Sequence, residues 1–239
     1  MKLTQLKLSS LAILCLTLTL GACSDDDDDE MMTDTMPDPT PVNVSYEVTV
    51  TNLTYGQPLS PIAVVLHDEG QLWQVGEAAS MALETVAEGG DNSGILGLDI
   101  VMASTSGAAP LGPGASETLT ISIEDKMDAK LSLVTMLVNT NDAFTGLTSV
   151  DLASLMAGDT WSSMAGVYDA GTEGNSEAMG TIPGPADGGT GFDASRDDVD
   201  FVAKHPGVVS QDDGLSTSVL TQAHRFDNPA VHISITRTE

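Results

Sequence analysis

The chain has 239 residues, and 35 acidic side chains against 8 Lys and Arg give it a formal charge of −27 at pH 7. Such a surface repels nucleic acid and anionic lipid headgroups, so the composition argues against both as partners. The hydrophobic fraction is 41% but the aromatic fraction only 4%, so we expect a core built from aliphatic side chains.

Residues 1–22 have the pattern of an export signal. They begin with a basic segment, continue through apolar residues 8–20 and end in small residues before Cys23. A secretory signal has this order, and its apolar stretch is shorter than the roughly 20 residues that span a bilayer. Residues 20–23 resemble the lipobox of bacterial lipoproteins. We therefore predict a lipoprotein signal peptide over residues 1–22 and a lipid anchor on Cys23; the alternative is a soluble secreted protein.

Residues 23–41 are predicted to be a lipidated tether, because an acidic run at 25–30 is followed by three prolines. The run resembles an acidic export signal, which suggests attachment at the bacterial outer membrane or cell surface; calcium binding by the run itself is the weaker reading. The only other cysteine, Cys15, lies in the segment predicted to be removed, so no disulfide can form within the mature chain. The mature domain must therefore be held together by its hydrophobic core, by a metal ion, or by both.

The rest of the chain, residues 42–239, is predicted to form one domain of mostly antiparallel strands. Alternating apolar and polar residues predict strands at 42–53, 117–125 and 231–236, and shorter apolar runs predict central strands at 62–66, 95–101 and 131–138. A further candidate strand covers residues 161–168.

One segment has helical spacing instead. Residues 76–88 carry apolar side chains on one face and stop at Gly89-Gly90, which predicts a helix with a glycine stop. Residues 183–198, rich in Gly, Asp and Pro, predict a long loop. The expected fold class is all-β, an antiparallel β-sandwich with one short helical insertion.

Two stretches concentrate oxygen-bearing side chains. Residues 169–177 carry them at every second position after Glu173, and residues 139–142 form a second cluster after the strand predicted at 131–138. Calcium takes about six to eight oxygen ligands in flexible geometry, so the two loops could meet around one ion. The EF-hand pattern fits only in part, because Gly180 stands where its last glutamate should be. Ordinary solvated turns in an acidic protein are the alternative.

Several motifs, in order along the chain, resemble those of the spondin N-terminal domain. They are Ser60-Pro61 with His67, Ala87-Glu88-Gly89-Gly90, Thr140-Asn141-Asp142-Ala143-Phe144-Thr145-Gly146-Leu147, Asp169-Ala170-Gly171-Thr172-Glu173 and Ile182-Pro183-Gly184. The resemblance implies a C2-like β-sandwich that binds calcium at one end. Animal members of the family act in extracellular-matrix and cell-adhesion settings.

The resemblance also implies a set of metal ligands. They would be Asp142 from the first loop, Asp169 and Glu173 from the second, and a backbone oxygen near Ser176. Animal members usually have a second aspartate where this chain has Glu173, which puts the geometry and affinity of the site in question. Asn175 and Glu177 are additional candidates.

The histidines and the catalytic motifs point to no enzyme class. The four histidines lack the spacing of a zinc-binding helix and are interpreted as structural, with His67 the first to examine because it falls within a family motif. No catalytic signature is found in the chain. We expect no enzymatic activity.

The leading hypothesis is a calcium-binding module, tethered to the cell surface or envelope, that binds an unknown extracellular protein or glycan. The alternatives are an extracytoplasmic hydrolase acting on polysaccharide and a purely structural envelope lipoprotein.

Overall fold

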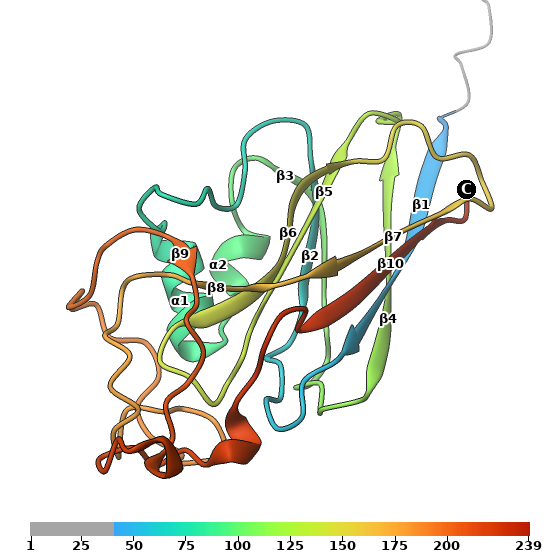
Figure 1. Cartoon of the computed structure of the whole chain (residues 1–239). Coiled ribbons are helices and arrows are strands. Elements are labelled where there is room, and N and C mark those ends of the chain that lie inside the picture. Colours follow the sequence, from blue (N-terminus) through green and yellow to red (C-terminus); the bar gives the residue numbers. More distant parts are fainter. Residues whose placement is uncertain (1–40) are drawn as a thin grey trace, which may run out of the picture. The chain divides into compact units, whose positions relative to one another are not determined.

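The computed structural model describes residues 41–239, in which two antiparallel β-sheets pack face to face (Figure 1). The first sheet has the order β4-β1-β10-β7, with strands Ser116–Glu124, Asn43–Asn52, Val231–Arg237 and Thr160–Ala165. The second sheet has the order β3-β2-β5-β6-β8-β9, with strands Val101–Ser106, Ala63–His67, Lys130–Met136, Ala143–Asp151, Val167–Asp169 and Ala203–Lys204. The predicted all-β sandwich is confirmed.

The main core lies between the two sheets. The alternation in β1 buries Val44, Tyr46, Val48 and Val50, all at most 1% exposed, against the inner face of the second sheet. The outward positions of the first sheet carry mostly hydroxyls, which pair across strands, as Thr49 does with Thr118. The period-two pattern therefore separates an aliphatic interior from a polar outer face, as expected for a sheet exposed on one side.

A second core lies on the outer face of the second sheet, where helices α1 (Met81–Gly89) and α2 (Ser93–Leu96) pack. Ser80 is the N-cap of helix α1, and its Oγ accepts a hydrogen bond from the Leu83 N–H. Gly90 is the C-cap of the helix and adopts a left-handed conformation with φ 69°. The predicted glycine stop is confirmed, although the helix starts later than position 76.

Two expectations about strands were wrong, and strand β6 was missed. Residues 95–101 do not form a central strand, because Ile95 belongs to α2 and packs in the second core, and strand β3 begins only at Val101 and lies at the sheet edge. Residues 161–168 form two strands, since the chain leaves the first sheet after Ala165 and enters the second at Val167. Strand β6 was not predicted, because its half-polar sequence lacks a clear alternation.

Most of the chain between β8 and β10 is irregular. Residues 183–198 contain no helix or strand, as predicted for a loop, and two short 3₁₀ helices follow, η1 (Gln211–Asp213) and η2 (Gln222–His224). Within residues 41–239 no helix is both long and apolar enough to cross a membrane.

Replacing Gly90 by alanine tests the helix stop. A left-handed conformation costs a non-glycine residue about 1–2 kcal/mol, and the new Cβ would lie 2.9 Å from the Ser60 Cβ. We expect Gly90→Ala to lower the free energy of unfolding by at least that amount in urea denaturation. Gly112→Ala is the matched control, because nothing lies within 4 Å of its added Cβ. Equal stability of the two variants would contradict this account of the helix end.

Candidate metal centre

The pairing of β6, β8 and β9 brings three ionisable side chains together at one end of the second sheet. Asp142 directly precedes β6, whose first residue Ala143 pairs with Asp169 at the end of β8. Strand β9 pairs in turn with β8, and His205 is the residue that follows it. One ligand atom from each of Asp142, Asp169 and His205 lies within 4.8 Å of the others, and all three residues are buried.

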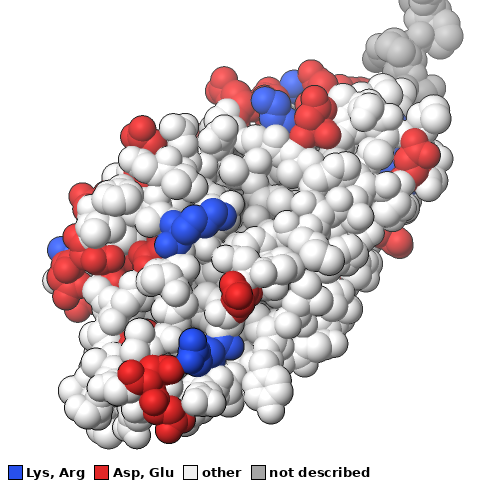
Figure 2. Space-filling view, viewed as in Figure 1, with Lys and Arg blue, Asp and Glu red and all other residues white. Residues whose placement is uncertain are grey.

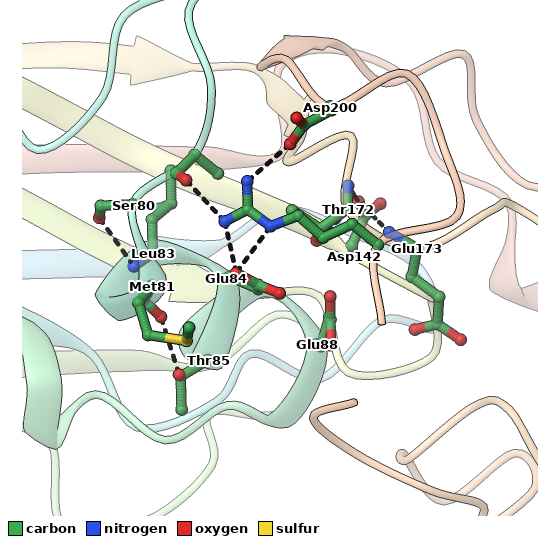
Figure 3. Close-up of polar contacts among 12 residues, drawn as sticks. Ser80, Met81, Leu83, Glu84, Thr85, Glu88, Asp142, Thr172, Glu173 and Asp200 are labelled. Atoms are coloured by element: carbon green, nitrogen blue, oxygen red, sulfur yellow. Dashed lines mark hydrogen bonds and ion pairs between the residues drawn. The ribbon is translucent and has the colours of Figure 1, made fainter. Parts of the chain in front are cut away.

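Of these three groups, Asp142 has the surroundings that least favour its charged form. Its Oδ2 accepts hydrogen bonds from the backbone N–H groups of Thr172 (2.8 Å) and Glu173 (3.2 Å), so the second loop wraps over it (Figure 3). Its Oδ1 is buried and has no hydrogen-bond partner. Burial, and then the neighbouring charge of Asp169, raise the pKa of Asp142 to about 8. At neutral pH this carboxyl therefore holds a proton that it can share with Asp169, unless a cation takes the proton's place.

Asp169 is only 4% exposed, but both of its oxygens have donors. Oδ1 accepts from the Gly171 N–H at 2.8 Å and Oδ2 from the Asn175 amide at 2.7 Å. These bonds hold the carboxylate in place beside Asp142. They leave further lone pairs on both oxygens, which a cation could use.

The hydrogen bonding of His205 defines its tautomer. The Gly207 N–H donates to Nδ1 at 2.9 Å, so Nδ1 carries the lone pair and the proton of the neutral ring lies on Nε2. Nε2 is buried without a hydrogen-bond partner, 4.0 Å from the Asp169 Oδ2. Burial lowers the pKa of His205 to about 4, even though Asp169 raises it. The ring is therefore neutral at pH 7, and this contact is not an ion pair.

The remaining predicted ligands lie near the pair of aspartates but do not point at it. Glu173 reaches Asp142 through its backbone N–H, while its carboxylate accepts from the Asn141 amide and extends away from Asp142 (Figure 3). The side chain of Ser176 is exposed and bonds to Thr181. The structure thus brings together Asp142 and Asp169 among the predicted ligands, but not the side chains of Glu173 and Ser176.

The additional candidates Asn175 and Glu177 have different positions. Asn175 donates to Asp169 and so orients a predicted ligand. Glu177 is 2% exposed, accepts from the Val209 N–H at 3.1 Å, and has a pKa raised to about 7 by burial. It ties the second loop to the segment around position 209.

His67 has a structural role. Its Nδ1 contacts the Glu69 carbonyl oxygen and its Nε2 the Ser132 hydroxyl, both at 2.8 Å, so neither ring nitrogen is free. His205 lies beside Asp169, a position that the sequence did not predict. Sequence reasoning missed it because it contacts Asp169 only through the β8–β9 pairing, and a lone histidine before Pro206 carries no signal of that pairing.

Acidic side chains surround this end of the domain. Burial and the charges of Glu88, Asp197 and Asp193 raise the pKa of Glu173 to about 7. On the face drawn in Figure 2, most of the acidic side chains gather in clusters near the rim, and broad areas between them carry no charge. Without a cation, these carboxylates lie close together in the folded state with no bound positive charge to reduce their mutual repulsion.

A scan of the chain against models of protein families gives no match, and a search of curated proteins gives none either. The spondin resemblance remains a prediction from the motifs alone.

The buried carboxyls predict an unusual pH dependence for the metal-free protein. The folded pKa values of Asp142, Glu173 and Glu177 lie above the ordinary values of 3.8 and 4.5. Between those values and pH 7–8 these three carboxyls bind more protons in the folded state than in the unfolded state. The lowered pKa of His205 acts in the opposite direction up to about pH 6.5, but three carboxyls outweigh one histidine, so stability falls as pH rises. We expect urea denaturation with chelator present to give a lower free energy of unfolding at pH 8 than at pH 5.

The isosteric variant Glu177→Gln isolates one contribution, because its amide oxygen can still accept from the Val209 N–H. Its stability should fall less steeply over the same pH interval than that of the wild type. A wild-type stability that is constant or rises from pH 5 to pH 8 would contradict the prediction.

Proposed function

We propose that the chain is a calcium-stabilised, spondin-like binding module of the cell surface or envelope, and that Asp142 and Asp169 are the core of its calcium site. The observation that carries the proposal is the buried carboxylate pair, in which the Asp142 Oδ1 has no partner. Buried charges in proteins are paired or coordinate metals, because an isolated one is costly. Calcium would replace the proton shared by the two aspartates and would release it on binding.

The donor set favours calcium over zinc. A zinc site would need a ring nitrogen of His205 with a free lone pair, but Nε2 holds the proton while Nδ1 accepts from Gly207. The atoms left for a cation are carboxylate and backbone oxygens, which suit calcium. His205 is then a neutral neighbour of Asp169 and not a ligand. Glu173 and a backbone oxygen near Ser176 complete the site in this proposal, which requires the Glu173 side chain to turn from Asn141.

The same geometry disfavours the hydrolase alternative. Asp142 is fully buried, so a polysaccharide could not reach it without opening the loop above it. Glycosidases place their two carboxyl groups on either side of an accessible bond, whereas both aspartates here are buried. A metal that fixes two loops, and so presents one end of the sandwich to an extracellular protein or glycan, agrees better with this burial.

Melting with and without calcium tests the proposed site. At a free calcium concentration 100 times Kd, binding adds about 2.7 kcal/mol to stability, and for a domain of this size that corresponds to roughly 5–10 °C in Tm. We expect Asp142→Asn to reduce this increase. In chelator above pH 8, where Asp142 is mostly ionised, the same variant should be more stable than the wild type by about 1–3 kcal/mol, because its amide can donate to Asp169 where the ionised carboxylate cannot.

Asp212→Asn removes one charge from an exposed position and is the matched control, which should keep the full calcium response. The proposal is wrong if calcium leaves the Tm of the wild type unchanged. It is also wrong if Asp142→Asn responds to calcium as the wild type does.

The proposed anchor lies outside the described residues and is tested separately. Replacing Cys23 by serine removes the thiol that would carry the acyl chains, so the protein should move from the detergent-rich to the aqueous phase in detergent partitioning. Incorporation of labelled fatty acid should be lost as well. Cys15→Ser is the control, because that cysteine lies within the predicted signal peptide and its replacement should change neither result.

A further inference from the structure

Helix α1 buries two glutamates on one face, away from the aspartate pair. Glu84 and Glu88 are one helical turn apart, so their side chains lie on the same side of the helix, and they are 0% and 1% exposed. In each, one carboxylate oxygen, Oε1, is buried and has no hydrogen-bond partner. Figure 3 shows the free end of Glu84 pointing to the side on which Glu88 lies.

Arg196 compensates only part of this charge. Its Nε and Nη2 both bond the Glu84 Oε2, its Nη1 bonds Asp200 at 2.6 Å, and Nη2 also donates to the Ala79 carbonyl oxygen. These contacts occupy the guanidinium and none of them goes to Glu88. The single guanidinium bonds only Glu84 and Asp200, so with Glu84, Glu88 and Asp200 all ionised the group has a formal charge of −2.

Glu88 has donors on one side only. Its Oε2 accepts from the Asp193 N–H at 2.9 Å, and the Thr172 hydroxyl also bonds the carboxylate. Both donors favour the ionised form, whereas Oε1 meets neither a donor nor water in its buried position. A buried carboxylate of this kind is satisfied by a proton or by a cation. Because Glu84, Glu88, Asp200 and Arg196 together have a formal charge of −2, one divalent cation would neutralise them.

We propose a second divalent-cation site between helix α1 and the 190–200 loop, with Glu84 Oε1 and Glu88 Oε1 as its carboxylate ligands. Calcium and magnesium both bind such oxygens, and ordered waters complete the shell when a protein offers only a few ligands. This site does not depend on calcium binding at Asp142.

The cation would fasten the 190–200 loop to the helix. The loop already contacts α1 through Asp193, Arg196 and the backbone of Phe192, which lies against Gly89. The Thr172 hydroxyl lies between Glu88 and Asp142, at 3.5 Å from the Asp142 Oδ2, so the two sites share one loop. Filling the second site therefore stabilises the same loop that covers the first.

Counting bound cations in isosteric variants tests the proposal. The full chain, purified in detergent and stripped with chelator, is titrated with calcium and separately with magnesium, and bound ions are counted by equilibrium dialysis. We expect Glu88→Gln and Asp142→Asn each to bind one cation fewer than the wild type, and the double variant two fewer. The acidic run at 25–30 is present in every variant, so its contribution cancels in these differences. Glu124→Gln, which removes an exposed carboxylate of β4, should match the wild type.

The outcomes separate the two sites. If Glu88→Gln keeps the wild-type count with both ions, the second site is wrong, whatever Asp142→Asn does. If Asp142→Asn keeps the count while Glu88→Gln loses one ion, the second site is supported and the calcium site of the proposed function is wrong. The titration that shows the loss identifies calcium or magnesium as the ion.

A further measurement avoids dependence on the folding of Glu88→Gln. In the Asp142→Asn variant, added cation should still slow amide hydrogen exchange at Asp193, because the ion fixes the carboxylate that accepts from this N–H. Exchange that is unchanged by calcium and by magnesium would overturn the proposal.

Discussion

The structure at this end of the domain depends on one constraint of backbone register. Because Ala143 pairs with Asp169, the residue before β6 and the last residue of β8 are held side by side, whatever charges they carry. Two carboxylates in such a position repel each other, and burial strengthens the repulsion because water no longer screens it. Hydrogen bonds along the whole sheet stabilise the strand pairing. The aspartates therefore stay side by side although their proximity is electrostatically unfavourable.

The loop that follows β8 is shaped by the same constraint. It turns its Thr172 and Glu173 N–H groups toward Asp142, and the Asn141 amide oxygen accepts the Glu177 N–H. The loop is thus organised by polar contacts with the carboxylates more than by an apolar core of its own. Loops of this kind respond to changes in charge at their anchor points, and a proton or a cation at the aspartates changes the energy of the entire segment.

Regular elements were predictable where the pattern was clear. The alternation of β1, β4 and β10 and the glycine stop of α1 follow directly from side-chain order. The run at 95–101 was ambiguous, since a short apolar stretch suits a buried helix as well as a strand. The switch between sheets at Gly166 was not predicted, because the residues on both sides of it read as one candidate strand.

The site was predictable in part for the same reason. Asp142 and Asp169 stand out because each follows an apolar segment and lies in an oxygen-rich loop. His205 and Glu88 do not stand out, because their positions depend on the β8–β9 pairing and on the packing of α1 against a distant loop. Such contacts join residues far apart in the chain, and periodicity carries no information about them.

The place of β1 in the first sheet has a mechanical consequence. The chain that precedes Asn43 enters the domain through a strand bonded along its length to β4 on one side and to β10 on the other. A pull on that chain acts along the strand axis, so both ladders of hydrogen bonds carry the load in shear and must fail together. The fold therefore resists extraction from its N-terminal side much more strongly than peeling at an edge such as β7.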